Sequence, residues 1–334
     1  MDFNNRRHMH AVAADRLENA QSVPRIALTY GGIVVLSSFL ATTVNFGLGQ
    51  LTNQYGGLQN MGTRTILSTI RSMLPILMQL LLMALELGFV STMLRVSRRQ
   101  FASAQGLRMG FDRFWPLIKV TVLQSCLYLV AVMGSFYLSM QIFMITPLSN
   151  PVMEVLSPLL QSSGALNPMT MLEDPNLTGQ LTAAMAPLFV LMGIVMLCAC
   201  LPLFYHYRLV NYIIIDKPSI PALAALGESW RLMKHNCLGM FKLDLSMWWY
   251  YLAMAGCMVL CYGDVILSLF GVSLPMSGTV SYFLTLILYL LGSLAVICVL
   301  RPRVEITYAL AYDSLRPQDP HDPGGAVLGN IFNM

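Results

Sequence analysis

The chain has 334 residues, of which 56% are hydrophobic and only 11% charged, and its mean hydropathy is +0.63. Soluble domains carry roughly 25% charged residues, so most of the surface of this chain cannot face water. The formal net charge of +4 is small, and the absence of a long basic run gives no indication of a nucleic-acid partner. The seven cysteines lie in apolar stretches or in an inner loop, so we expect free thiols and no disulfide framework.

Several apolar runs exceed the ~20 residues that an α-helix needs to cross a bilayer. Barrel strands would instead alternate apolar and polar residues over ~10 positions, and these runs do not alternate. The sequence therefore predicts an all-α polytopic membrane protein with six transmembrane helices and an amphipathic in-plane helix on the cytoplasmic side. The predicted spans are residues 26–48, 66–94, 115–145, 183–205, 243–270 and 279–300.

The two ends of the chain differ from the six-helix domain predicted over residues 26–315. Residues 1–25 are charged and polar, and we interpret them as a cytoplasmic segment with a short helix over 11–20. The apolar run from Ile26 is too long for the hydrophobic region of a signal peptide, so we interpret it as a retained first span. Residues 316–334 are rich in Pro, Gly and Asp, which predicts a disordered tail.

Two further segments lie between or after the spans. Residues 146–182 contain no Lys or Arg, and short surface helices are expected around 152–160 of this external segment, whose role the sequence does not indicate. Residues 304–315 follow the last span, and we expect an amphipathic helical turn or two there.

The placement of Lys and Arg tests the six-span layout. Of the 20 Lys and Arg residues, all except Arg64 and Arg71 fall at the ends or in the loops of one side. Because short loops rich in Lys and Arg stay in the cytoplasm, both termini are predicted to be cytoplasmic. Five or seven spans would scatter these charges over both sides.

The stretch 207–249 is patterned, whereas the spans around it are uniformly apolar. Ser219 is predicted to cap a helix that follows the turn at Asp216. One face of this helix carries Leu223, Leu226, Trp230, Met233 and Cys237. A helix of ~16 residues is too short to span, so we expect it to lie in the inner interface with this face in the lipid. The alternative is a helix packed against the underside of the bundle.

Three blocks of sequence resemble an uncharacterised bacterial integral-membrane family, catalogued as domain of unknown function number nine-seven-five. The blocks are LELGFVSTMLRVSRRQ with the basic loop that follows it, the stretch YRLVNYIIIDKPSIPALAALGESWRLMKHNCLGMFKLDLSMWW, and RPRVEITYALAYDSL. They cover residues 85–119, 207–249 and 301–315. The long 146–182 segment and the Pro/Gly tail depart from the family pattern. The resemblance implies a six-span protein of the bacterial inner membrane and implies no activity.

Ionisable residues within or beside the spans are the candidate sites, since each costs roughly 2.5–3.5 kcal/mol at a helix centre. Glu86 lies nine residues before Arg95, which is about 13 Å of helix and places it near the midplane. We expect it to be protonated, hydrated or paired, for example with His206 or Arg208 at the end of the fourth span.

Three other charged residues have simpler interpretations. Asp244 is interpreted as a carboxylate at a helix start, stabilised by the helix dipole. Glu305 is interpreted as a member of a local ion pair with the arginines just before it. Arg208 is interpreted as an anchor on the positive-inside side.

The sequence contains no recognisable catalytic, cofactor or metal motif. Neither the cysteine pairs nor the 24 methionines have His or carboxylate partners at the spacing of a metal site, and flexible packing explains the methionines. Gly106-x-x-x-Gly110 falls in a predicted loop, so it is not interpreted as a helix-dimer motif.

These observations leave three hypotheses about function. The first is a non-enzymatic protein of the bacterial cell membrane that acts through its basic inner face on membrane lipid or on a protein partner. The second is a transporter or transporter subunit, suggested by Glu86 and by two similar hairpins around the basic loops, which would be a parallel repeat. The third is an intramembrane enzyme, which needs a second catalytic group at the depth of Glu86, and the sequence identifies none.

Overall fold

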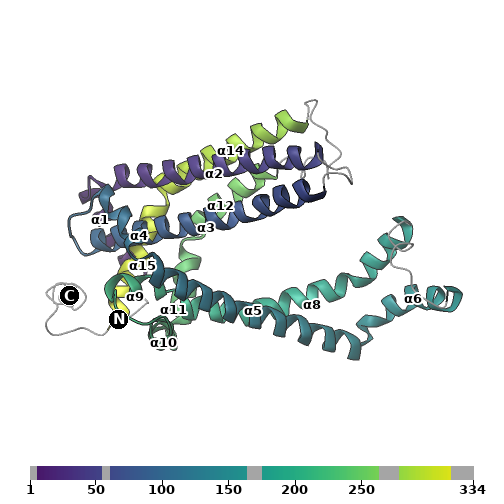
Figure 1. Cartoon of the computed structure of the whole chain (residues 1–334). Helices are drawn as coiled ribbons and strands as arrows, with labels where there is room; N and C mark the ends of the chain where they lie inside the picture. Colours follow the sequence, from purple (N-terminus) through teal and green to yellow (C-terminus); the bar gives the residue numbers. More distant parts are fainter. Residues whose placement is uncertain (1–5, 55–60, 164–174, 263–277, 317–334) are drawn as a thin grey trace. The chain divides into compact units, whose positions relative to one another are not determined.

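The computed structural model describes residues 6–54, 61–163, 175–262 and 278–316, and every regular element in these ranges is a helix (Figure 1). The helices of the first half are α1 (Arg6–Asn19), α2 (Val23–Gln54), α3 (Met61–Ser97), η3 (Ala104–Arg108), α4 (Met109–Asp112), α5 (Phe114–Ile145), η4 (Pro147–Ser149) and α6 (Asn150–Ser163). Those of the second half are α8 (Pro175–Tyr207), α9 (Val210–Asp216), α10 (Ala222–Met233), α11 (Cys237–Ser246), α12 (Trp248–Cys261), α14 (Gly278–Val299) and α15 (Arg301–Leu315). The predicted all-helical fold is confirmed for these residues.

Within the described residues, five helices are long and apolar enough to cross a membrane: residues 23–54, 62–97, 114–145, 179–216 and 282–299. The pair α11 and α12 passes the same test together but is bent by 65°, so that it counts as a sixth candidate only if the bent pair is one span. The sequence had predicted a single helix from residue 243 to 270. The structure instead breaks at Met247, and residues 263–277 lie outside the described part of the chain.

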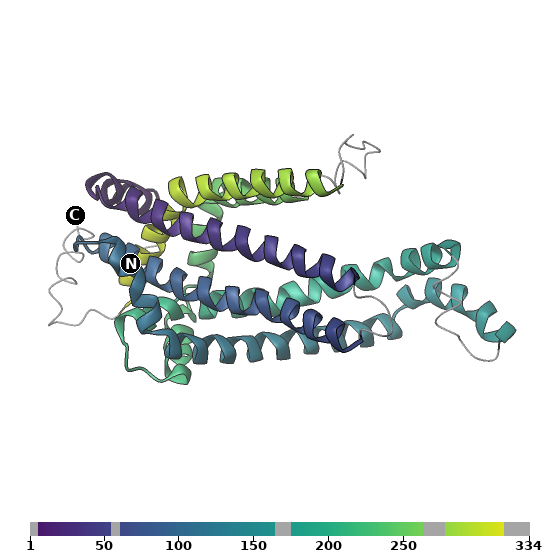
Figure 2. The same cartoon turned by 45° about the horizontal axis from the view of Figure 1, so that its top comes forward.

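The chain divides into two compact units, which we describe separately. The first unit comprises residues 1–119 and 209–334, and the second comprises residues 120–208. In the first unit α2 lies between α3 and α14, and α12 packs on α14 (Figures 1 and 2). Large apolar side chains such as Leu36, Ile66 and Leu77 are exposed along these helices, which is the pattern of helices that face lipid.

A basal layer closes one end of the first unit, where α2 begins and where α3 and α14 end. It consists of α1, η3, α4, α9, α10, α11, α15 and the adjoining ends of α2 and α3. Ile26, Phe89, Met93, Ile306 and Leu310 belong to a continuous apolar core that joins α1, η3 and α15 to the adjoining ends of α2, α3 and α14. The last third of α3 is therefore buried in protein, whereas its first two thirds are largely exposed.

Helix α15 corrects the expectation of an amphipathic turn or two after the last span. It runs for 15 residues and contacts α1, α3 and α14. Its buried residues are Pro302, Val304, Ile306, Thr307, Tyr308, Ala309, Leu310, Ala311 and Tyr312. Hydropathy underestimates this burial because Tyr and Thr carry hydroxyls, which are bonded within the protein, and because Ala contributes little apolar area.

Glycines allow η3 and α4 to approach the backbone of α3 very closely. A Cβ atom on Gly110 would lie 1.7 Å from the carbonyl oxygen of Ala84, and one on Gly88 would lie 2.1 Å from that of Leu107. A Cβ atom on Gly106 would lie 2.8 Å from the Thr92 hydroxyl. Gly106 and Gly110 are thus the glycines of an internal contact between the basic loop and α3.

Helix α10 is shorter than predicted and begins without the predicted cap. Its N-cap is Pro221, which makes no side-chain cap, so the interpretation of Ser219 as the capping residue is wrong. Leu226 and Met233 of the predicted apolar face are buried, whereas Leu223 is 73% and Trp230 40% exposed. The packing of α10 on α9 explains the buried positions.

The second unit consists of most of α5 together with η4, α6 and α8. The surface helix expected around residues 152–160 is confirmed as α6, which packs on α8. Residues 1–5, 55–60, 164–174 and 317–334 lie outside the described part of the chain, so the predicted disordered tail falls almost wholly outside it.

Candidate functional site

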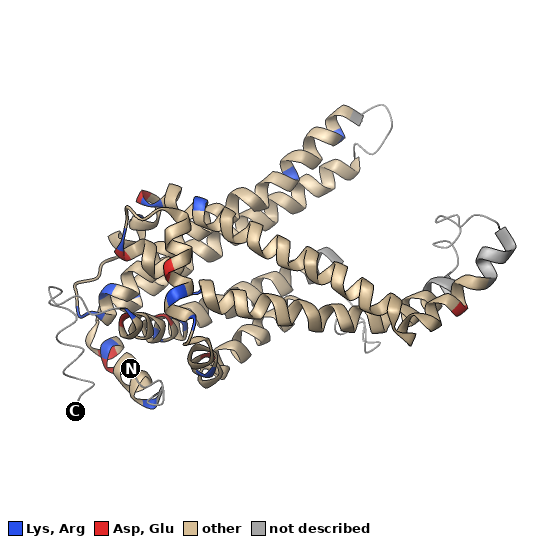
Figure 3. Ribbon diagram, turned by 90° about the horizontal axis from the view of Figure 1, so that it is seen from below, with Lys and Arg blue, Asp and Glu red and all other residues tan. Residues whose placement is uncertain are grey.

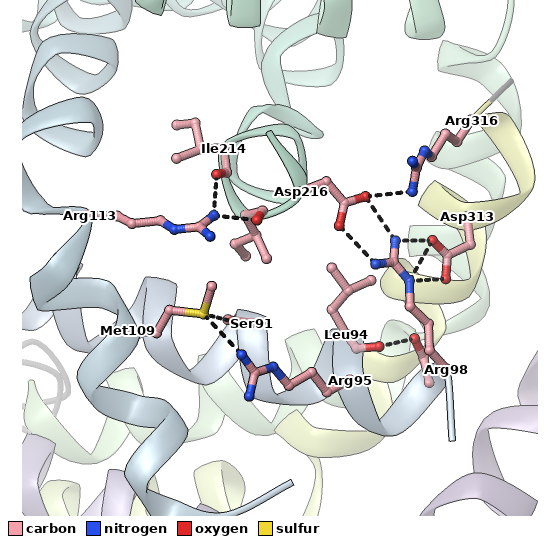
Figure 4. Close-up of polar contacts among 12 residues, drawn as sticks. Ser91, Leu94, Arg95, Arg98, Met109, Arg113, Ile214, Asp216, Asp313 and Arg316 are labelled. Atoms are coloured by element: carbon pink, nitrogen blue, oxygen red, sulfur yellow. Dashed lines mark hydrogen bonds and ion pairs between the residues drawn. The ribbon is translucent and has the colours of Figure 1, made fainter. Parts of the chain in front are cut away.

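A cluster of two arginines and two aspartates joins three helices of the basal layer (Figure 4). Arg98, which follows α3, donates two hydrogen bonds to Asp216 of α9, at 2.8 and 2.9 Å. The same guanidinium donates to Asp313 of α15, and the shortest of these contacts is 2.5 Å. Arg316 adds a hydrogen bond of 3.1 Å to Asp216. Charge in this cluster is balanced, and paired bidentate contacts of this kind fix the orientation of both partners.

The cluster lies where α3, α9 and α15 all end. Helix C-termini carry unpaired carbonyl groups and partial negative charge, so three of them side by side require cations. Arg98 and Arg316 supply this charge, and Arg113 donates to the carbonyl oxygens of Ile214 and Ile215 in the last turn of α9 (Figure 4). The arginines therefore stabilise the helix ends as well as the aspartates.

Protonation states in the cluster follow from burial and pairing. Burial opposes the charged form of Arg98, but hydrogen bonds with Asp216 and Asp313 outweigh it, so that the pKa of Arg98 is raised. Burial raises the pKa of Asp313, and the neighbouring Arg98 counteracts this shift only in part. Arg98 is therefore a permanent cation that holds the two carboxyl groups together.

A second cluster surrounds Arg301, the first residue of α15. Arg301 donates to Glu86 of α3 at 2.6 Å and to the Tyr30 hydroxyl of α2 at 2.9 Å. Its guanidinium also lies 5.2 Å from the centroid of the Tyr30 ring, which stacks on Phe89 at 4.4 Å. Burial opposes the charge on Arg301, but the nearby acidic groups, with Glu86 the largest contributor, together outweigh burial and raise the pKa of Arg301.

Glu305 completes the second cluster. Its carboxylate lies 3.7 Å from Nε of Arg301, one helical turn away, and accepts a hydrogen bond of 3.1 Å from the Tyr212 hydroxyl. The interpretation of Glu305 as a member of a local ion pair is confirmed.

The pairing with Arg301 changes the position inferred for Glu86. Arg301 follows immediately after the apolar span of α14, so Glu86 lies level with the end of that span. The partner that the structure gives to Glu86 is Arg301, and not the suggested His206 or Arg208. Counting residues along α3 did not reveal this, because hydropathy does not separate residues that face lipid from residues buried in the basal layer.

Asp244 lies in the last turn of α11, so the interpretation as a carboxylate at a helix start is wrong. It is buried and accepts a hydrogen bond of 2.7 Å from Tyr308 of α15. The hydroxyl of Tyr308 is in turn 2.9 Å from that of Tyr251 in α12. Asp244 thus holds α15 against the bend between α11 and α12.

Replacing Tyr308 with phenylalanine is expected to destabilise the first unit by about 1–3 kcal/mol, because it removes a donor from a buried carboxylate. The effect would be measured as a lower thermal midpoint of the purified protein. Tyr251→Phe, which removes a hydroxyl from a more exposed residue, serves as the control and should cost less. A midpoint equal for Tyr308→Phe and the wild type would contradict the role given to this contact.

His206 and Arg208 belong to the second unit. The His206 ring nitrogen Nδ1 is 2.8 Å from the Pro202 carbonyl oxygen, and the Arg208 guanidinium lies 5.0 Å from the centroid of the Phe204 ring. Both contacts are local to the end of α8. Of the four residues singled out from the sequence, Glu86 and Asp244 thus lie in two different clusters of the first unit.

Residues that sequence reasoning missed form the most connected part of the layer: Arg98, Asp216, Asp313 and Arg301. One signal was present, since an aspartate in the last turn of a helix is opposed by the helix dipole and needs a cation nearby. The sequence could not indicate which cation, because the partners are 118 and 215 residues away.

His10 of α1 links the N-terminal segment to α11. Its Nε2 atom is 2.8 Å from the Ser246 hydroxyl. Burial, and then the charge of Arg303, lowers the pKa of the imidazole from its ordinary value of 6.5. The folded state therefore favours neutral His10.

Acidification is expected to loosen α1. The pKa of His10 is lower in the folded state than in the unfolded state, so protonating His10 favours unfolding. The stability that neutral His10 contributes is therefore present above pH 6.5 and is lost as the pH falls below it. Proteolysis between α1 and α2 should accelerate from pH 7.5 to pH 5.5 in the wild type and less so in His10→Gln. Equal acceleration in both proteins would exclude His10 as the cause.

The described residues contain no group of three or more His, Cys, Asp or Glu side chains that could hold a metal ion. The seven cysteines are all free. Among the cavities that the described residues of the first unit line, one lies between the start of α2 and the end of α3 and another lies beside α10.

The described residues are all-helical and include five or six candidate spans, which places this chain in the class of multi-pass membrane proteins. The chain belongs to the family described as protein of unknown function, DUF975, which matches residues 5–319. No curated protein and no solved structure matches it significantly.

Proposed function

We propose that the protein is a six-span protein of a bacterial cytoplasmic membrane, with both termini in the cytoplasm. We further propose that it acts without catalysis, by binding anionic lipid through its basal layer. A protein partner at the same face is the alternative occupant.

The observation that carries this proposal is the distribution of charge in the first unit. Lys and Arg gather in and around the basal layer (Figure 3). Arg64 and Arg71 are the exceptions in this unit and lie in the first half of α3. Positive charge on one side of a set of spans favours a cytoplasmic location for that side.

Lipid is the favoured occupant because charged and aromatic side chains are exposed together at this end. Each Lys or Arg near an anionic membrane surface contributes about 1 kcal/mol of attraction. Phe101 is 88%, Trp115 70% and Trp248 61% exposed, and aromatic residues are enriched at membrane–water interfaces.

Binding to nanodiscs tests this function. The purified protein should retain phosphatidylglycerol in preference to phosphatidylcholine, and higher ionic strength should weaken the preference because exposed charges are screened. A reporter fused after Met334 should be active only in the cytoplasm. Equal retention of the two lipids would refute the lipid function, and crosslinking at the basal layer would then show whether a protein occupies it.

The transporter hypothesis has less support. That hypothesis requires Glu86 near the midplane of the membrane, whereas Glu86 is paired with Arg301 beside the end of α14. Uptake of a substrate that is abolished by Glu86→Gln, with the fold retained, would reverse this preference.

A further inference from the structure

An open cavity of about 1040 Å³ lies between the turn that joins α1 to α2 and the segment that follows α3. Three arginines line it: Arg16 from the last turn of α1, Arg25 from the first turn of α2, and Arg99 from the end of α3. Asp15 is the one carboxylate among the described residues that line it. The lining thus carries excess positive charge.

Arg16 is the unusual member of this set. Its side chain is 95% buried, since only 5% of the residue is exposed, yet Nε and Nη1 have no hydrogen-bond partner among the described residues. A cation in the last turn of a helix interacts favourably with the dipole, which is the structural explanation for Arg16. That explanation does not account for the two unpartnered donors, because buried polar groups are otherwise satisfied almost without exception.

Arg99 occupies a position that favours glycine. The amides of Arg99 and Gln100 donate to the carbonyls of Val96 and Arg95, which is the Schellman arrangement at the end of α3. Arg99 has a φ of 58°, in the left-handed region. A residue with a side chain costs roughly 1 kcal/mol relative to glycine in this conformation. Arg99 nevertheless occupies the position and lines the cavity with a cation.

Asp15 does not neutralise Arg99 effectively. Their closest atoms are 4.0 Å apart, and the side chains are 64% and 56% exposed for Arg99 and Asp15 respectively. Exposed pairs of this kind contribute little, because water screens both charges. An anion with several oxygens would compete well with Asp15 for the guanidinium group.

The depth of the cavity suits a phospholipid headgroup. Arg25 precedes Tyr30 by five residues, which is about 7.5 Å of helix. Tyr30 contacts Arg301 at the end of the α14 span, and the headgroup layer is roughly 5–8 Å thick on each side of the hydrocarbon core. Ser22, directly before α2, also lines this cavity, so the N-terminus of α2 adds partial positive charge there.

We propose that this cavity binds a phosphate group, supplied by the headgroup of an anionic phospholipid, with Arg16, Arg25 and Arg99 as its ligands. This inference rests on the proposed function and gives it a specific site. The unpartnered donors of Arg16 would bond the phosphate oxygens, and Arg99 would close the cavity from the side of α3.

The test compares the full-length wild type with Arg16→Met and Arg99→Gly. Short-chain phosphatidylglycerol and, separately, inorganic phosphate are titrated against the protein in neutral detergent, and binding is followed by the rise in thermal midpoint. Each variant should bind about tenfold more weakly, because each loses a charge-assisted hydrogen bond. Arg99→Gly keeps the helix cap, because glycine favours the left-handed conformation at this position. The control is Lys234→Gln, which removes an exposed charge outside the cavity and should bind both probes as the wild type does.

Stability without ligand gives an independent readout. Arg16→Met should raise the thermal midpoint, because it removes a buried cation without a partner and keeps a side chain of similar length. Asp15→Asn should tighten binding, because it removes the competing carboxylate. A lower midpoint for Arg16→Met would show that Arg16 supports the fold and would overturn its assignment as a ligand.

The outcomes separate this inference from the proposed function. Preference for anionic lipid that is unchanged in both variants would overturn the cavity site and leave the proposed function standing. A second outcome is that the wild type binds inorganic phosphate but not the lipid, and that the variants lose this binding. This result would support the phosphate site and assign it to a soluble phosphate compound. It would also refute the lipid function. If the wild type bound neither the lipid nor inorganic phosphate, both the cavity site and the proposed lipid function would be overturned.

Discussion

Replacing Arg98 with methionine is expected to destabilise the first unit by about 3–5 kcal/mol, because the change leaves two buried carboxylates without their shared cation. The side chains of Asp216 and Asp313 are only 9% and 7% exposed, so water cannot replace the guanidinium. Arg316 donates a hydrogen bond of 3.1 Å to Asp216, but it does not replace the hydrogen bonds from Arg98 to both carboxylates, so it compensates only in part. The thermal midpoint of the purified protein measures the effect.

Two comparisons isolate the cause. The triple variant Arg98→Met, Asp216→Asn, Asp313→Asn should recover much of the loss, because neutral amides tolerate burial better than unpaired carboxylates. Arg108→Met removes an exposed arginine from the neighbouring η3 and should stay within about 0.5 kcal/mol of the wild type. A wild-type midpoint for Arg98→Met would mean that the cluster does not hold the three helix ends together.

Gly110→Ala is expected to destabilise the basal layer by about 3 kcal/mol or more, at the upper end of the cost of overpacking. The added methyl group would lie 1.7 Å from the Ala84 carbonyl oxygen and 2.8 Å from the Gly88 amide nitrogen. Both atoms belong to the backbone of α3, which cannot move aside as a flexible side chain can. The thermal midpoint and the yield of folded protein would both fall.

Gly32→Ala and Gly227→Ala are matched controls for this prediction. Both glycines are helical, and a Cβ atom on either would meet nothing within 4 Å. Alanine there should be neutral or stabilising by up to about 1 kcal/mol, because it reduces the conformational freedom of the unfolded chain. If Gly110→Ala behaved as these controls do, α4 would not contact α3 as closely as the structure has it.

The sequence by itself determined the helical class and most of the apolar helices. Spans predicted over residues 26–48, 66–94, 115–145, 183–205 and 279–300 each coincide with a helix, because an apolar run of that length satisfies its backbone only as a helix. It also located helix α6 and the family resemblance that the match over residues 5–319 confirms. These features depend on local composition alone.

Local composition failed where the polar residues were concerned. Glu86 was visible as a charged residue in an apolar run, but its partner Arg301 lies 215 positions away. Asp244 was assigned to a helix start because the apolar span was predicted to begin at residue 243, whereas α11 begins at Cys237. In both cases the neighbour that decides the role of the residue comes from a distant part of the chain.

Only the tertiary structure decided that a helix of low hydropathy would be among the most buried elements. The hydroxyl of Tyr308 in α15 meets Asp244, and the Asp313 carboxylate meets Arg98. A hydropathy scale counts the free energy that each of these groups loses on leaving water. Hydrogen bonds to partners within the protein offset that loss. The sequence thus determined which segments are helices that can enter a membrane, and tertiary contacts decided which polar groups are buried, since burial depends on partners that local sequence does not reveal.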